Sequence, residues 1–188
     1  MAEPSDEELM LALRDGELPA FDVLFRRHYE AVRGMCARIM AGGSDGDDPA
    51  QETFLRVLRH RATFRGDARF TTWVYRIARN VCLEHMARQA RDRKISERRG
   101  MEATASAALD QSLDTELLAT AMRALTPEQR EVLVLCRFHD LPFSEIATIL
   151  GCTPGAARVR AHRALNDLRE AYQALVQPEM RKLGSDSN

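Results

Sequence analysis

A chain of 188 residues has room for one large or two small domains. Its amino terminus is acidic, and its longest aliphatic run, Val132 to Cys136, falls far short of the roughly 20 residues that span a bilayer, so we expect a cytoplasmic protein without membrane insertion. The net charge of −1 is uneven: residues 1–54 carry 12 acidic and 5 basic side chains, and residues 55–99 carry 4 and 13. Phosphate binding depends on local charge, so nucleic acid stays a possible partner.

Enzyme chemistry has little support in the sequence. The five histidines do not pair with carboxylates at metal-site spacing, and neither a nucleophile–base pattern nor a phosphate-binding glycine loop occurs. We therefore predict no enzyme activity and no cofactor. The cysteines are isolated on apolar helical faces and form no C-x-x-C, which favours small buried hydrophobes in a reducing compartment over a redox switch. They are Cys36, Cys82, Cys136 and Cys152.

Helical periodicity runs through the whole chain, without strand-like alternation. Ser5 to Glu8 is a capping box for a short first helix that ends near Gly16. A long second helix carries apolar residues at three- and four-residue steps from Phe21 to Ile39, and the glycine-rich segment 42–46 ends it. A third helix is predicted to begin at Asp48-Pro49.

A fourth helix is predicted to begin near Thr71 or Thr72, inside the basic segment 64–80. Aromatic and arginine side chains alternate in this segment, a mixture suited to single-stranded DNA because rings stack on bases and guanidinium groups follow phosphates. The alternative is that the aromatic residues are core and the arginines a solvated face, since aromatics at helical spacing are more often buried.

Composition then changes. Residues 95–115 contain no aromatic and almost no branched aliphatic side chain, which predicts a flexible linker. After it, residues 117–125 form an amphipathic helix, and Thr126 to Gln129 caps the next one. The predicted fold is all-α, with two small helical domains, 1–94 and 116–176, and a tail, 177–188.

Residues 141–172 have the pattern of a helix-turn-helix. The first helix spans Phe143 to Leu150, Gly151 supplies the turn, and Thr153 with Pro154 starts the second helix. Basic side chains near the amino end of the second helix face outward, where helix-turn-helix proteins enter the major groove. An ordinary helical hairpin with a solvated basic face is the alternative.

The motifs DDPAQETFLRVLRH, FRGDARFTTWVYRIARN and LTPEQREVLVLC, in this order and followed by the helix-turn-helix, resemble the extracytoplasmic-function group of bacterial sigma factors, in the sigma-70 family. The resemblance covers nearly the whole chain. It implies a transcription initiation factor that binds the RNA polymerase core, reads and melts the minus-ten promoter element with its first domain, and reads the minus-thirty-five element with its second. It also implies control by an anti-sigma factor.

The resemblance assigns roles to residues by matching motifs. It places polymerase-core contacts at Asp48, Gln51, Glu52, Phe54 and Leu55. It places minus-ten DNA contacts at Phe64, Arg65, Gly66, Asp67, Ala68, Arg69, Trp73, Arg76 and Asn80, and minus-thirty-five contacts at Thr153, Arg158, Arg160, His162 and Arg163. Two alternatives remain: a sigma-like mimic that captures an anti-sigma protein, and a two-domain regulator that does not bind polymerase.

Overall fold

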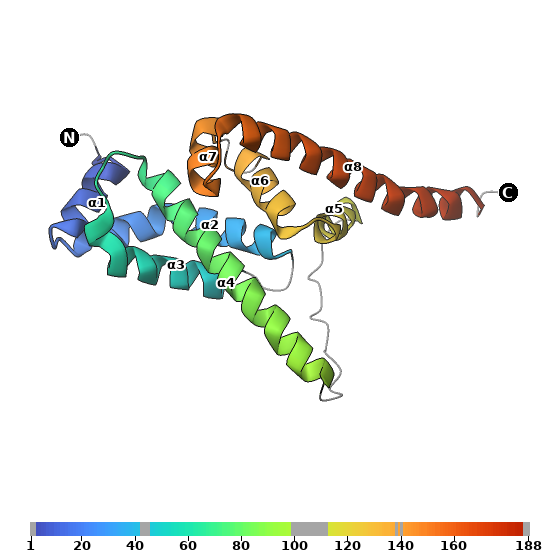
Figure 1. Cartoon of the computed structure of the whole chain (residues 1–188), viewed down its shortest axis with the longest axis horizontal. Coiled ribbons are helices and arrows are strands. Elements are labelled where there is room, and N and C mark those ends of the chain that lie inside the picture. The colour runs from blue at the N-terminus through green and yellow to red at the C-terminus, as the bar shows by residue number, and fades with distance from the viewer. Residues whose placement is uncertain (1–2, 42–45, 99–112, 138, 140, 186–188) are drawn as a thin grey trace.

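The computed structural model describes residues 3–41, 46–98, 113–137, 139 and 141–185, and the regular elements in these ranges are all helices (Figure 1). They are α1 (Asp6–Arg14), α2 (Pro19–Met40), α3 (Asp47–His60), the 3-10 turn η1 (Arg61–Thr63), α4 (Phe70–Arg98), α5 (Leu113–Ala124), α6 (Pro127–Arg137), α7 (Phe143–Leu150) and α8 (Pro154–Ser185). The all-α prediction is confirmed. No described helix combines the length and the apolar content that a membrane span needs.

Two predicted capping boxes form. The N–H of Ser5 donates to the Glu8 carboxylate at 2.8 Å, and the N–H of Glu8 donates to the Ser5 hydroxyl at 3.2 Å. At the start of α6, the N–H of Thr126 donates to the Gln129 side chain at 2.7 Å, and the N–H of Gln129 donates to the Thr126 hydroxyl at 3.3 Å. Each box satisfies amide groups that the first turn of a helix leaves without a partner, and so fixes where the helix begins.

Helices α4 and α8 are longer than the sequence pattern predicts. Helix α4 continues through residues 95–98 of the predicted linker, and α5 includes residues 113–115. Low aliphatic content limits burial but does not prevent a helix, because Arg, Lys, Gln and Glu are good helix formers. The rest of the predicted linker, 99–112, lies outside the described residues, and the domain boundaries stay predictions. Residues 177–185 of the predicted tail continue α8.

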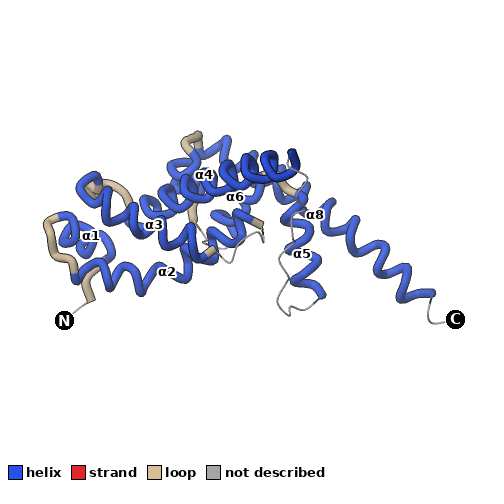
Figure 2. Tube along the Cα trace, turned by 90° about the horizontal axis from the view of Figure 1, so that it is seen from below, coloured by secondary structure: helices blue, strands red, loops and turns tan. Residues whose placement is uncertain are grey.

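Helices α1 to α4 enclose one group of buried side chains. Large members that are fully buried are Met10, Leu13, Leu24, Met35, Ile39 and Phe70. The ring of Phe54 in α3 packs edge-on against Phe25 in α2, with centroids 4.9 Å apart. These contacts hold α2 and α3 side by side, as both views show (Figures 1 and 2).

Helices α5 to α8 form the second half and pack directly on the first (Figure 1). Helix α6 lies against α2, and α7 lies against α4. The rings of Tyr75 in α4 and His139 lie against each other across this boundary at a tilt of 53°, with centroids 4.6 Å apart. The two halves are thus in contact although residues 99–112 separate them in sequence.

Candidate functional site

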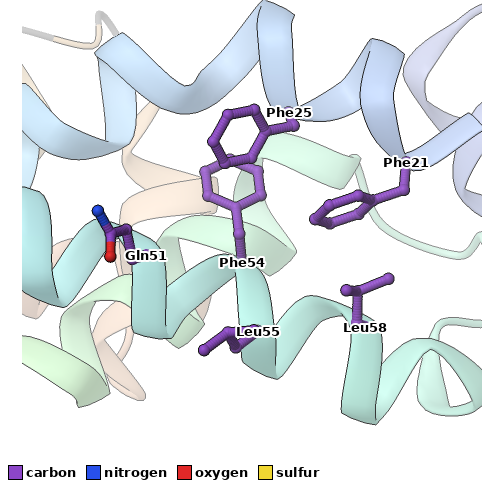
Figure 3. Close-up of a pocket in the computed structure, with 6 residues that line it drawn as sticks. All are labelled: Phe21, Phe25, Gln51, Phe54, Leu55 and Leu58. Carbon is purple, nitrogen blue, oxygen red and sulfur yellow. The ribbon is translucent and has the colours of Figure 1, made fainter.

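An apolar groove of about 260 Å³ lies between α2 and α3 (Figure 3). Its lining residues are Phe21, Phe25, Gln51, Phe54, Leu55 and Leu58. Phe54 is buried at the base, whereas Leu55 is 48% exposed and Gln51 is exposed beside it. A large aliphatic side chain left half in water next to aromatic rings is typical of a protein contact surface.

The other predicted polymerase contacts on α3, Asp48 and Glu52, differ in how far the rest of the chain engages their side chains. Asp48 is exposed in the first turn. Glu52 accepts a hydrogen bond from Arg56 at 2.8 Å, and Arg56 also donates to Glu84 in α4 at 2.6 Å. The hydrogen bonds from Arg56 lower the pKa of Glu84. Arg56 therefore fixes α3 against α4, and Glu52 is already engaged within the chain.

The predicted minus-ten loop joins η1 to α4. Residues 65–69 are exposed, and Gly66 has a φ of 78°, a left-handed conformation that favours glycine. Phe64 before the loop is buried and packs edge-on against Trp73, with centroids 5.5 Å apart. After the loop, the N–H of Phe70 donates to the Glu7 carboxylate of α1 at 2.8 Å. Buried aromatic residues thus anchor both ends of an exposed loop.

Aromatic rings of the basic segment belong to the core. Phe64, Phe70, Trp73 and Tyr75 are all buried. In this conformation their rings are not available to stack on bases, which agrees with the alternative interpretation of the interleaved pattern. DNA contact by Phe64 and Trp73 remains a prediction, and both residues support the loop from below.

The second half of the chain contacts one edge of the predicted minus-ten surface. Arg76 and Asn80 on α4 are exposed. On the neighbouring face, the Thr72 hydroxyl donates to Glu145 of α7 at 2.7 Å, and Arg69 pairs with the same carboxylate at 3.4 Å. Arg79 donates to Glu131 of α6. Acidic side chains of the second half therefore form hydrogen bonds and ion pairs with basic and hydroxyl groups of the first.

The helix-turn-helix forms as predicted. Gly151 has a φ of 65° at the turn, and the Thr153 hydroxyl accepts the N–H of Ala156 at 3.2 Å, as an N-cap does. Ala157, Ala161 and Ala164 bury one face of α8. The predicted contact residues Arg158, Arg160, His162 and Arg163 are all exposed, and the guanidinium of Arg158 lies 5.3 Å from the ring centroid of Phe143 in α7.

Two buried charges on α6 were missed by sequence reasoning. Arg130 donates to the backbone carbonyls of Ile39 and Leu125, each at 2.8 Å, and burial lowers its pKa. Glu131 is 1% exposed, and burial raises its pKa despite the pairing with Arg79. Helical periodicity predicts that adjacent residues differ in burial. Both are buried because α6 packs on α2, α7 and α8 together.

Of the four cysteines, Cys36 and Cys82 are fully buried, as predicted, and Cys136 and Cys152 are half-buried. A hydrogen bond between Cys82 and Cys36, together with burial, raises the pKa of the Cys82 thiol. A raised pKa disfavours the thiolate, the reactive form, so this pair behaves as part of the core.

Comparison with known proteins agrees with the two halves. Residues 24–92 match Sigma-70 region 2, and residues 115–168 match Sigma-70, region 4. The chain is 38% identical over 164 residues to RNA polymerase sigma factor CarQ of Myxococcus xanthus, covering 86% of this chain and 94% of that protein. It is 31% identical over 191 residues to the ECF RNA polymerase sigma-E factor of Escherichia coli K12, covering 95% and 97%. The chain belongs to the sigma-70 family.

Within that family it is an extracytoplasmic-function sigma factor, as its relatives indicate. As a sigma factor, it directs RNA polymerase to promoters and initiates transcription. The family consists of transcription initiation factors rather than enzymes.

Solved structures show the same fold. CnrH in complex with the cytosolic domain of CnrY matches with a TM-score of 0.68 at 25% identity, over 91% of this chain and 99% of that one. The sigma factor RpoE of Bartonella quintana, in complex with the anti-sigma factor NepR, matches with a TM-score of 0.70 at 22% identity, over 81% and 96%. The prediction of two helical domains is thereby confirmed.

Proposed function

We propose that this sigma factor divides its work among three surfaces. The groove between α2 and α3 binds the polymerase core, through Gln51, Phe54 and Leu55, with Asp48 and Glu52 at its edge. The loop 64–69 and the outward face of α4, including Arg76 and Asn80, bind the minus-ten element. The amino half of α8 enters the major groove of the minus-thirty-five element. The corresponding domains are 1–94 and 116–176.

The observation that carries the proposal is the exposed Leu55 beside the buried ring of Phe54. About half of the Leu55 side chain is exposed to solvent, and the neighbouring Phe21, Phe25 and Leu58 of the groove are only partly buried. A polymerase helix that packs along α3 would bury Leu55 and take a hydrogen bond from Gln51. Work as a polymerase subunit on promoter DNA also supports a cytoplasmic location.

Control by an anti-sigma factor is part of the proposal. CnrH is bound to the cytosolic domain of CnrY in a structure that covers 91% of this chain. An anti-sigma factor that covers the groove between α2 and α3 would block polymerase binding directly. The exposed basic face of α8 argues against a mimic that only captures an anti-sigma protein, because a mimic does not need DNA contacts.

The test replaces Leu55 by aspartate and measures association with purified core polymerase. A carboxylate at a half-exposed position can stay in water, so Leu55→Asp should fold normally and lose polymerase binding, whereas a buried carboxylate would cost folding. Ile95→Asp is the matched control, because Ile95 is 49% exposed on the far part of α4. Normal polymerase binding by Leu55→Asp would move the clamp surface elsewhere. Failure of the unaltered chain to bind would favour the two-domain regulator.

A further inference from the structure

The outward face of α8 has a centre and two flanks. Ala157, Ala161 and Ala164 mark the buried line of the helix. With about 100° of rotation per residue, Val159 lies almost opposite that line, and Arg158 and Arg160 lie about 100° to either side of it. Of the three arginines that the sequence motif assigns to the DNA contact, Arg158 and Arg160 are therefore flank residues, and the centre belongs to Val159, which the motif did not select.

Val159 is 51% exposed and takes no part in the hydrophobic core. A β-branched residue also forms helices less readily than alanine, so the fold gains nothing from valine here. Its neighbours on the same face one turn further along are polar: His162 and Arg163 are both exposed. An apolar side chain thus stands at the middle of a cationic surface.

Gly155 precedes Val159 by one helical turn and lies on the same face. Its backbone is helical and is not in the left-handed region. A Cβ built on Gly155 would meet no atom within 4 Å. The described fold therefore does not require glycine at this position, where alanine would be the better helix former. The missing side chain leaves open space directly in front of Val159.

We propose that Val159 is the base-reading centre of α8 and packs on the 5-methyl group of a thymine in the minus-thirty-five element. Thymine is the only base that carries a methyl group in the major groove, and apolar side chains recognise it there. The open surface at Gly155 lets the backbone of α8 approach the base edges. Arg158 and Arg160 then hold the phosphates on either side. This inference rests on the proposed entry of α8 into the major groove.

The contact requires that the flanks reach the DNA backbone. Arg158 already extends sideways over the Phe143 ring, towards the first helix of the motif. Arg160 lies on the opposite side, towards the buried Glu131 of α6, whose pKa is raised by burial, an effect that the Arg79 and Arg160 charges only partly offset. The two arginines thus leave α8 on opposite sides of Val159, which leaves base contact to Val159 and to His162 and Arg163 in the next turn.

The test uses the full chain with core polymerase and a promoter duplex randomised across the minus-thirty-five element. The selected duplex is then remade with deoxyuridine at one thymine at a time, which removes the methyl group and nothing else. Unaltered protein should lose affinity about fourfold at one thymine, the effect of one buried methyl group. Val159→Ser should bind the thymine and deoxyuridine duplexes equally. Leu118→Ser, at an exposed apolar position of α5, should keep the fourfold difference.

Gly155→Ala supplies a second measurement. It should leave the thermal midpoint of the protein unchanged or raise it. It should also weaken binding to the thymine and deoxyuridine duplexes by the same factor, because the added methyl group keeps α8 from the base edges. Binding as tight as that of unaltered protein would overturn the close approach. If every deoxyuridine exchange affects unaltered protein and Val159→Ser equally, the assignment of Val159 is overturned, while a recovered element still supports major-groove reading. Recovery of no element at all would overturn the proposed function of α8 itself.

Discussion

The hydroxyl of Thr72 in α4 donates to the carboxylate of Glu145 in α7 at 2.7 Å, across the boundary between the two halves of the chain. The first helix of the helix-turn-helix is therefore tied to the start of the helix that carries Arg76 and Asn80. Because Arg69 pairs with the same carboxylate, Glu145 joins both the loop and the helix of the predicted minus-ten surface to the second half.

Replacing Glu145 by alanine should loosen the two halves. The change removes a hydrogen bond to a charged acceptor, worth about 1.5–3 kcal/mol, and a weaker ion pair, since Arg69 is 71% exposed. Small-angle scattering of the free protein should show a larger radius of gyration. Glu170→Ala, at an exposed site on α8, is the control and should leave the radius of gyration unchanged. An unchanged radius in Glu145→Ala would mean that the apolar contacts alone hold the halves together.

Arg130 should be among the most sensitive positions of the interface. Its guanidinium reaches carbonyls at the carboxyl ends of α2 and α5 together, where helices leave acceptors without partners and favour positive charge. Arg130→Ala should lower the free energy of unfolding by about 2–4 kcal/mol, as loss of a buried charged hydrogen-bond group does. Arg130→Lys should recover little, because one ammonium group does not reproduce the planar fork. Denaturant unfolding with full recovery in the lysine variant would contradict this role.

Glu131 should make the molecule less stable as the pH rises. Burial raises its pKa above the ordinary value of 4.5, so below that value the carboxyl is protonated in both the folded and the unfolded chain. As the pH rises, the unfolded chain ionises first, and the folded state loses stability until its own pKa is passed. Glu131→Gln should therefore remove this loss and gain stability over the unaltered protein at neutral pH.

Glu128 provides a control of opposite sign. Hydrogen bonds from its own backbone and from the Thr126 side chain lower its pKa, so its stabilising effect is present above the ordinary value and is lost as the pH falls. Denaturant unfolding of Glu131→Gln and Glu128→Gln at about pH 4.5 and about pH 7 should give differences of opposite sign. Parallel pH profiles for both variants would show that Glu131 is not the titrating group.

Exchange of residues 65–69 for the loop of a sigma factor with another specificity should change the preferred minus-ten base. Selectivity is expected where contacts form only after a base has left the stack, which costs a few kcal/mol. Phe64 stays in place because it packs on Trp73, and its removal would disturb the core. Alanine at Arg76 or Asn80 should reduce open-complex formation without changing the base preference. Transcription from a library randomised at the minus-ten element measures both.

Two glycines at helix ends should differ sharply in their tolerance of alanine. Gly46 has a φ of 88°, and a Cβ there would lie 2.4 Å from the Arg33 carbonyl oxygen. Gly151 has a φ of 65°, and its Cβ would meet nothing within 4 Å. Gly151→Ala should lower the free energy of unfolding by about 1 kcal/mol through conformational strain. Gly46→Ala should lower it clearly more, since the backbone of α2 near Arg33 must also move. Similar thermal midpoints for the two variants would contradict this.

The helix starts were predictable because they depend on local chemistry. Ser5, Thr126 and Thr153 each cap a helix with a side chain a few residues from its partner, and that spacing is written in the sequence. The contact between the halves was not predictable, because Arg79 and Glu131 are 52 residues apart in sequence and no local pattern links them. The exposure of single apolar residues could not be predicted from the sequence either. Phe64 and Leu55 are both apolar, and only the packing of the helices decides that Phe64 is core and Leu55 is surface.

The acidic groups that α6 and α7 present to α4 have one more consequence. Glu131 and Glu145 place carboxyl oxygens against Arg79, Arg69 and the Thr72 hydroxyl, the kinds of group that otherwise hold a DNA backbone. The second half thus holds carboxyl groups against side chains of α4 and the loop 64–69 that could bind phosphates. If the loop 64–69 and α4 bind the minus-ten strand as proposed, a strand that reached Arg69 or Arg79 would have to displace these carboxylates, whereas Arg158 and Arg163 on α8 are exposed to duplex DNA.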